Sequence, residues 1–156
     1  MANDDKIRAA AFSQIRQFGD PVLKEESHPV EVDDELRKLV DRMVKIMHAA
    51  DGVGLAAPQI GVLRKVIVFH FDKEEHVLIN PRITWRSEDT DTDAEGCLSF
   101  ASLAVDVERA KAVKAEGEDL EGNHKVYEVE GLKARILQHE IDHLEGLMIV
   151  NRTSRE

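Results

Sequence analysis

The sequence predicts a single α+β domain in which helical segments precede and follow a largely antiparallel β-sheet. Two stretches carry apolar residues at helical spacing, and between them lie short β-rich runs separated by turn residues. The 156 residues suffice for one core, and no internal repeat, low-complexity segment or linker is present. We therefore expect residues 1–156 to form one domain, with residues 1–12 as a candidate disordered segment.

The charge of the chain excludes several kinds of partner. Lys and Arg number 21 against 31 Asp and Glu, which gives a formal net charge of -10 and opposes binding to nucleic-acid phosphates or to an anionic membrane. No stretch has the length of a transmembrane helix, and the start, Met-Ala-Asn-Asp-Asp-Lys, lacks the pattern of a signal peptide. We expect a soluble, cytoplasmic protein with no direct nucleic-acid or membrane ligand.

The first predicted helix lies between Asp33 and Gly52. Acidic residues at its start are typical of a helix N-terminus, and an apolar stripe at helical spacing indicates a face that packs into the core. The segment Gly-Val-Gly-Leu-Ala-Ala-Pro-Gln that ends at Gln59 follows. Its glycines and proline favour an ordered loop with exposed backbone groups.

The centre of the chain is predicted to be antiparallel sheet. Two β-rich runs, 65–71 and 76–80, are separated by the polar residues 72–75, which suggests a hairpin. Residues 87–93 are predicted to form a polar, acidic loop, and residues 147–150 a return to the sheet. Further short strands are predicted at 83–86, 103–107, 110–115 and 125–129, with a turn at 117–122 before the last.

A second helical stripe begins after Gly131 and carries the motif His139-Glu140-x-x-His143. The two histidines are four residues apart, so on a helix they share one face and can hold one metal ion. The neighbouring carboxylate is placed to handle the proton of a metal-bound water, as in hydrolytic metal sites. A solvated charged face is the alternative for this motif taken alone.

The single cysteine, Cys97, lies in Glu95-Gly-Cys-Leu-Ser99 and cannot form an internal disulfide. It is a candidate third metal ligand, because a catalytic metal usually has three protein ligands. A lone cysteine is also commonly a small buried apolar residue, so both interpretations stay open on these residues alone.

Three blocks now occur in order: the segment from Gly52 to Gln59, the segment around Cys97, and Gln138-His-Glu-Ile-Asp-His-Leu-Glu-Gly146. Together they closely resemble the signatures of the peptide deformylase family, and the resemblance runs from about residue 15 to residue 153. It implies antiparallel sheets packed around a central C-terminal helix that carries the His-Glu-x-x-His motif. It also implies hydrolysis of the N-formyl group of formylmethionyl nascent peptides, with release of formate.

The resemblance implies roles for individual residues. Cys97, His139 and His143 would bind one divalent metal, with Fe²⁺ as the physiological ion and Zn²⁺, Ni²⁺ or Co²⁺ able to occupy the site. Glu140 would transfer the proton from the attacking water to the departing amine. The Gln59 side chain and the Leu98 backbone N–H would stabilise the developing oxyanion, and the Gly54 backbone would pair with the peptide.

Other residues are candidates for supporting roles. Glu95, Asp142 and Arg109 are expected to form an ion-pair network that fixes the ligand segments, with ordinary solvated charge as the alternative. Val53, Leu132 and Ile136 are expected either to line the pocket for the substrate methionine or to belong to the core. The histidines outside the motifs are expected to be ordinary surface or packing residues, and these are His28, His48, His70, His76 and His124.

The chain departs from the family pattern after the cysteine block. It has Phe100-Ala101-Ser102 where a Pro-Gly or similar turn is common, and Ala104 where many members have a peptide-contacting arginine. A deformylase or amidohydrolase for a different N-formyl or N-acyl group is therefore the alternative function. A metallopeptidase and a non-catalytic metal-binding module are weaker rivals. The sequence also ends without the basic C-terminal helix that some members use to dock on the ribosome, so docking by that route is not expected.

Overall fold

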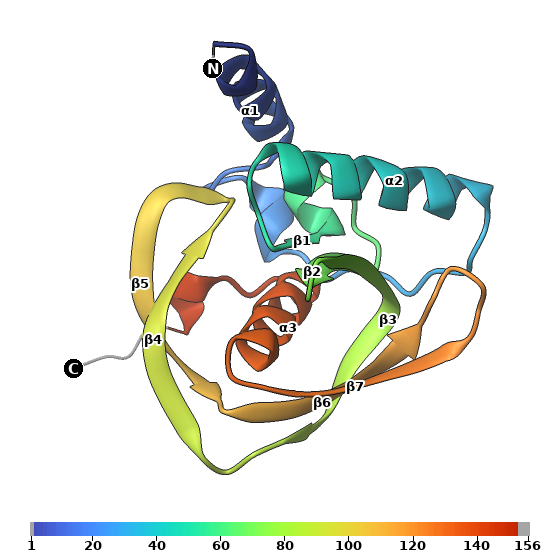
Figure 1. Cartoon of the computed structure of the whole chain (residues 1–156), viewed down its shortest axis with the longest axis vertical. Helices are drawn as coiled ribbons and strands as arrows, with labels where there is room; N and C mark the ends of the chain where they lie inside the picture. Colours follow the sequence, from blue (N-terminus) through green and yellow to red (C-terminus); the bar gives the residue numbers. More distant parts are fainter. Residues whose placement is uncertain (1, 153–156) are drawn as a thin grey trace.

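The computed structural model describes residues 2–152 and has the predicted α+β architecture (Figure 1). The helices are α1 (Ala2–Gln14), α2 (Asp34–Ala49) and α3 (Leu132–Leu144), with short 3₁₀ helices at η1 (Pro21–Lys24), η2 (Ala57–Ile60) and η3 (Ile149–Asn151). The strands are β1 (Gly54–Ala56), β2 (Val66–Phe71), β3 (Glu74–Arg86), β4 (Thr90–Cys97), β5 (Phe100–Ala110), β6 (Ala112–Glu118) and β7 (His124–Glu130).

All strand pairs are antiparallel and form two separate sheets. Five strands pair in the order β1-β2-β3-β6-β7, and β4 pairs with β5. Helix α3 lies between them, enclosed by the larger sheet on one side and by β4 and β5 on another (Figure 1). Every residue of α3 from Ala134 to Leu144 is buried, so the predicted central helix is confirmed.

Strand β2 separates two hydrophobic cores because both of its faces are covered. Val66 and Val68 pack with α2, whereas Ile67 and Phe69 point to the opposite face and pack with α3.

The predicted helix after Asp33 is also confirmed as α2, and the Asp33 carboxylate caps it by accepting from the Leu36 N–H at 2.8 Å. Strand β1 and helix η2, which lie between α2 and β2 in the chain, contact α3 directly.

Several local predictions were wrong. Residues 2–14 form helix α1 rather than a disordered segment, with Ala11 and Ile15 anchored in the core. The expected loop ending at Gln59 contains strand β1 and helix η2, because β1 finds a partner in β2. Residues 149–151 form η3 rather than a strand.

The strand boundaries also differ from the sequence prediction. The turn after β2 consists of Asp72 and Lys73 alone, both with positive φ, as in a two-residue hairpin turn. Strand β3 continues through Pro81 to include 83–86, and the register of its pairing with β6 shifts there. The predicted 110–115 strand is divided between β5 and β6 at Lys111.

The predicted 87–93 loop is largely strand β4, which was missed because its residues are polar and mostly exposed.

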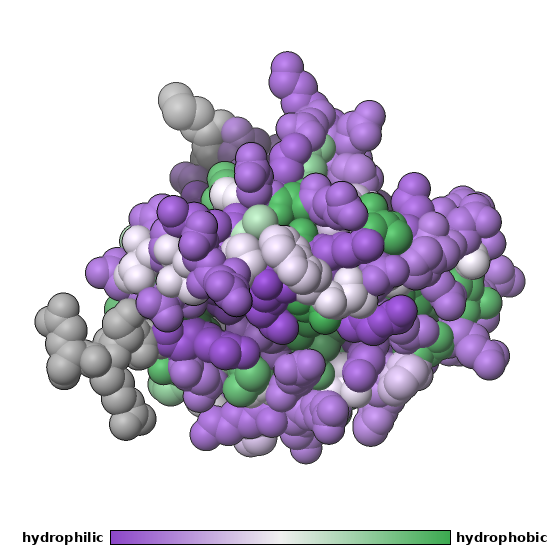
Figure 2. Space-filling model, turned by 90° about the horizontal axis from the view of Figure 1, so that it is seen from below, coloured by the Kyte–Doolittle hydropathy of each residue, from purple (hydrophilic) through white to green (hydrophobic). Residues whose placement is uncertain are grey.

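The face seen in Figure 2 is mainly hydrophilic, with hydrophobic side chains in small separate areas. Among residues 2–152, no helix is long and apolar enough to cross a membrane.

Candidate metal-dependent active site

The fold brings the three sequence blocks to one cleft of about 510 Å³. Its walls come from the segment before β1, from the end of β4 with the turn into β5, and from α3. Of the predicted site residues, the cleft lining includes Val53, Gly54, Gln59, Cys97, Leu98, Leu132, Ile136, His139 and Glu140. The size is in the range typical of small-molecule sites.

Cys97, His139 and His143 form a compact donor set. One potential ligand atom from each lies within 4.8 Å of the others, and Sγ of Cys97 is 3.4 Å from Nε2 of His143. The two histidines meet because they are one turn apart on α3, while Cys97 reaches them from the end of β4. A thiolate and two imidazoles fit a borderline divalent metal such as iron or zinc.

The protonation of the two imidazoles differs. Burial lowers the pKa of His143, which keeps the ring neutral, as a ligand must be. Burial also acts to lower the pKa of His139, but Glu140, Cys97 and Glu95 raise it well above its usual value. Binding of a cation would therefore displace a proton from His139.

Glu140 lies buried beside Gly54. A Cβ atom at Gly54 would lie 2.5 Å from Oε2 of Glu140, so only glycine leaves room for the carboxylate there. The Oε1 atom has no hydrogen-bond partner among the described residues. Burial raises the pKa of the Glu140 carboxyl to about 7, although the charge of His139 opposes this shift. A carboxyl with such a pKa is suited to accepting and returning a proton.

The amide of Gln59 is fixed with its nitrogen towards the metal donors. Its Oε1 accepts from the Ala56 N–H at 2.9 Å, and its Nε2 lies 3.2 Å from Oγ of Ser99 and 3.6 Å from Sγ of Cys97. The side chain is almost completely buried. It is therefore a held donor rather than a mobile surface amide.

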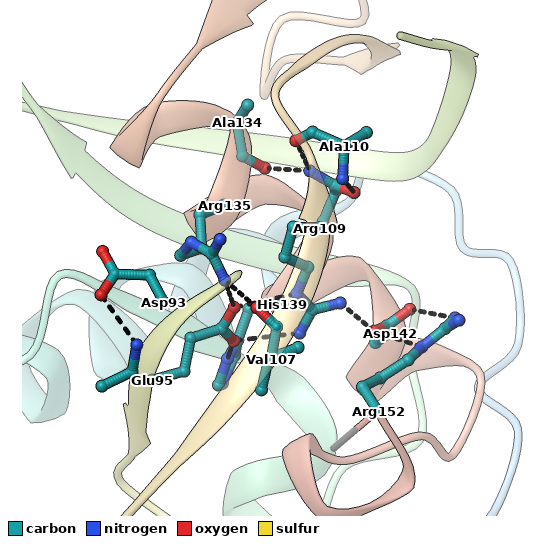
Figure 3. A network of polar contacts seen from close by, with 12 residues as sticks. Asp93, Glu95, Val107, Arg109, Ala110, Ala134, Arg135, His139, Asp142 and Arg152 are labelled. Carbon is teal, nitrogen blue, oxygen red and sulfur yellow. Dashed lines mark hydrogen bonds and ion pairs between the residues drawn. The ribbon is translucent and has the colours of Figure 1, made fainter. Parts of the chain in front are cut away.

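The predicted network of Glu95, Arg109 and Asp142 is present beneath the donors (Figure 3). Arg109 binds both carboxylate oxygens of Glu95, at 2.9 and 3.0 Å, and Asp142 at 2.5 Å. Nδ1 of His139 lies 2.9 Å from Glu95. Burial alone would raise the pKa of Glu95, but hydrogen bonds from His139 and Arg109 lower it to about 2. Glu95 is therefore a carboxylate that joins the β4 and α3 sides of the site.

Arg135 is a buried member of this network that sequence reasoning missed (Figure 3). Its guanidinium donates to Glu95 at 2.6 Å, to the Val107 carbonyl at 2.8 Å and to Asp91 at 2.7 Å. It lies four residues before His139 on α3. An arginine on the same helical face as the proposed ligands was the signal that could have found it.

The outer wall of the cleft is apolar and partly exposed. Val53 and Leu132 are 51% and 70% exposed, so they are not core residues, whereas Ile136 both lines the cleft and packs in the core. Ala104 lies in the same cleft, as does Arg8 of α1, whose guanidinium is 3.4 Å from Asp51.

This fold, with a cysteine sulfur and two imidazoles beside a buried carboxyl, defines the chain as a hydrolase of the metal-dependent class. The family model described as polypeptide deformylase matches residues 12–156. The chain belongs to the polypeptide deformylase family.

Individual relatives agree with this family assignment. The peptide deformylase of Thermotoga maritima is 42% identical over 142 residues, which cover 90% of this chain and 87% of the relative. Peptide deformylase 2 of Gloeobacter violaceus is 45% identical, with 91% of this chain and 79% of the relative covered.

Solved structures of peptide deformylases have the same fold as this chain. The crystal structure of the Thermotoga maritima enzyme has a TM-score of 0.88 and 42% identity, covering 90% of this chain and 97% of that chain. A peptide deformylase from Synechococcus elongatus, solved in complex with actinonin, has a TM-score of 0.88 and 39% identity, covering 91% of this chain and 79% of that chain. The chain is thus an enzyme of the deformylase kind.

Proposed function

We propose that this enzyme hydrolyses the N-formyl group of formylmethionyl nascent peptides and releases formate. The observation that carries the proposal is the convergence of Cys97, His139 and His143 on one point beside the buried Glu140. Family membership supplies the reaction class, and this arrangement supplies the groups that the reaction needs.

Cys97, His139 and His143 would hold the metal, which when bound acts as a Lewis acid and makes water a better nucleophile. Glu140 takes the proton of the attacking water and returns it to the departing amine nitrogen. Nε2 of Gln59 and the backbone N–H of Leu98 donate to the formyl oxygen as it becomes negative. A fixed donor of this kind is worth about 2.7–4 kcal/mol to the transition state.

The cleft positions the peptide around this centre. The backbone of Gly54 on the edge strand β1 pairs with an extended peptide, as an added strand would. Val53, Leu132 and Ile136 provide apolar contacts for the methionine side chain. The net charge of -10 argues against direct nucleic-acid contact. The cytoplasmic location stays a prediction of the sequence.

We propose Fe²⁺ as the native metal, as membership of the deformylase family implies, with Zn²⁺, Ni²⁺ or Co²⁺ as substitutes because the mixed thiolate and imidazole donors suit all four. Iron(II) beside a thiolate is sensitive to oxygen, whereas zinc has no accessible redox change. The iron form should lose activity in air faster than the zinc or nickel form. Equal lifetimes of metal-matched samples in air and under argon would count against iron.

The deciding experiment is anaerobic purification, metal quantification and measurement of formate release from a formyl-Met peptide. Ala104 in the cleft favours one second candidate, a different N-formyl or N-acyl substrate. Faster turnover of an acetyl-Met peptide than of formyl-Met would support this candidate. Formate release from formyl-Met, with no turnover of the acetyl peptide, supports the proposed function.

A further inference from the structure

A second group of metal-binding side chains lies outside the active site, where α2 ends and the β2–β3 hairpin turns. His48, His70 and Glu75 each place one potential ligand atom within 4.8 Å of the other two. His48 and His70 stand outside the sequence motifs and were expected to be ordinary surface or packing residues. The tertiary structure brings them together.

The three residues stand on rigid elements. His70 and Glu75 are opposite each other across the antiparallel β2–β3 pair, close to the Asp72-Lys73 turn. His48 lies in the last turn of α2, where the carbonyl end of the helix dipole favours a cation. The backbone positions of all three are therefore fixed by secondary structure rather than by a loop.

The contacts among the side chains are those of a site that can take a cation. Nε2 of His48 is 2.6 Å from Oε1 of Glu75, and the His48 and His70 rings meet edge to face with centroids 5.3 Å apart. Nδ1 of His70 is buried and has no hydrogen-bond partner within residues 2–152. A buried ring nitrogen without a partner costs free energy, and in the neutral tautomer that carries its proton on Nε2 it offers an electron pair to a cation.

Small side-chain movements would give the three ligand atoms the separations found around a metal ion of the zinc type. Ligand atoms about 2.1 Å from a tetrahedral zinc stand roughly 3.4 Å from each other. The 2.6 Å contact between His48 and Glu75 is a direct hydrogen bond that must open to admit the ion, and their side chains, 43% and 49% exposed, have room to rotate for this and to leave the open position to water. Two imidazoles and a carboxylate are ligands that zinc accepts.

We propose that His48, His70 and Glu75 form a second binding site for a divalent transition-metal ion, with Zn²⁺ as the representative ion. Bound there, the ion ties the end of α2 to the β2–β3 hairpin. The segment between these elements runs through Val53, whose backbone carbonyl accepts a hydrogen bond from the backbone N–H of His70 at 3.0 Å. The second site therefore braces one wall of the active-site cleft without contributing to its chemistry.

The test uses enzyme loaded with nickel at the active site, dialysed against micromolar free zinc and analysed for both metals. Wild type should retain one nickel and one zinc per chain. His48→Asn and Glu75→Gln should keep the nickel and lose the zinc, and His70→Asn serves as a third variant if it folds. Nickel content reports the first site and His48-dependent zinc the second, so failure of one is distinguishable from failure of the other.

His124→Asn is the matched control. Nε2 of His124 is 2.9 Å from Oε1 of Glu116, and this pair has no third ligand among the residues described. The control should retain both metals. Zinc should also raise the Tm of nickel-loaded wild type and of His124→Asn but not of His48→Asn. The proposal is overturned if wild type binds no second metal, if zinc only replaces nickel, or if zinc binding survives His48→Asn or is lost in His124→Asn.

Discussion

Oε1 of Glu95 lies 2.9 Å from Nδ1 of His139, which leaves Nε2 of that imidazole free to point at the metal position. The same carboxylate holds Arg109 and Arg135, and it stands two residues before Cys97. One side chain thus sets the orientation of one proposed ligand and anchors the strand that carries another. Such supporting contacts tune metal affinity.

Glu95→Gln should weaken metal binding by about 10–100-fold, because the imidazole loses its anionic partner. It should also lower the free energy of unfolding, by at most about 3–5 kcal/mol, since buried Arg109 and Arg135 each lose one of two carboxylate partners and keep Asp142 and Asp91. Chelator competition and urea denaturation measure the two effects. Glu108→Gln, an exposed acid on β5, is the control and should change neither. Wild-type metal affinity in Glu95→Gln would contradict this role.

Glu140→Gln should keep its metal and lose turnover by about 10²–10⁴-fold, the usual contribution of general acid–base catalysis. The amide keeps the volume of the side chain but cannot take a proton. Metal analysis and formate release are measured on the same sample. Glu145→Gln, just beyond α3 and exposed, should behave as wild type. Near-normal turnover in Glu140→Gln would rule out the proton-transfer role.

Cys97→Ala should lose metal and activity together. The substitution removes one of three proposed protein ligands and the only negative charge among them. A cysteine that served only for packing would instead cost modest stability and leave metal content unchanged. Inductively coupled plasma analysis after gel filtration distinguishes the two outcomes, and a fully loaded, active Cys97→Ala enzyme would refute ligation.

Gly54→Ala should impair the enzyme through Glu140. The new methyl group would lie 2.5 Å from Oε2 of Glu140, and overpacking of this kind costs about 1–3 kcal/mol. We expect lower stability and lower kcat with metal content retained. Gly96→Ala is the matched control, because a Cβ there meets no atom within 4 Å. Equal kcat in the two variants would show that the glutamate has room to move.

Ala104→Arg should lower KM for short formyl peptides while kcat stays within about tenfold. A contact remote from the reacting carbonyl binds the ground and transition states alike, so it appears mainly in KM. Arg8 lines the same cleft, so the substitution is also made in an Arg8→Ala background. A folded Ala104→Arg enzyme with unchanged KM in both backgrounds would show that the departure from the family pattern is neutral.

Local pattern was sufficient to predict the two principal helices and the segments that form the site. The spacing of apolar residues in α2 and α3 reports which face is buried, since a helix places residues three and four apart on one side. The four-residue spacing of His139 and His143 fixes their proximity for the same reason. It was the resemblance of three short blocks to the deformylase family, rather than local pattern, that predicted that Cys97 and Gln59 join them.

Strand β4 and helix α1 were beyond local pattern. The polar residues of β4 carry no strand signal, and β4 is a strand because β5 supplies its hydrogen-bond partners. Helix α1 has almost no amphipathic pattern, yet Ala11 on it is buried against α2 and its neighbours. In both cases a distant partner outweighs weak intrinsic preference.

The sequence by itself therefore predicted the helix that presents His139 and His143, because that relation is local, and the family resemblance of its motifs added Cys97 and Gln59. The ion pairs of Glu95, Arg109 and Asp142 were also predicted, but only the tertiary structure decided which further groups surround the site. Arg135 became part of the site by reaching from α3 to Glu95 and Asp91 on β4. Gly54 met Glu140, and His48 met His70, through packing between elements far apart in the chain. Contacts of this kind depend on strand pairing and on the placement of α3 against the sheets, which no short window of sequence contains.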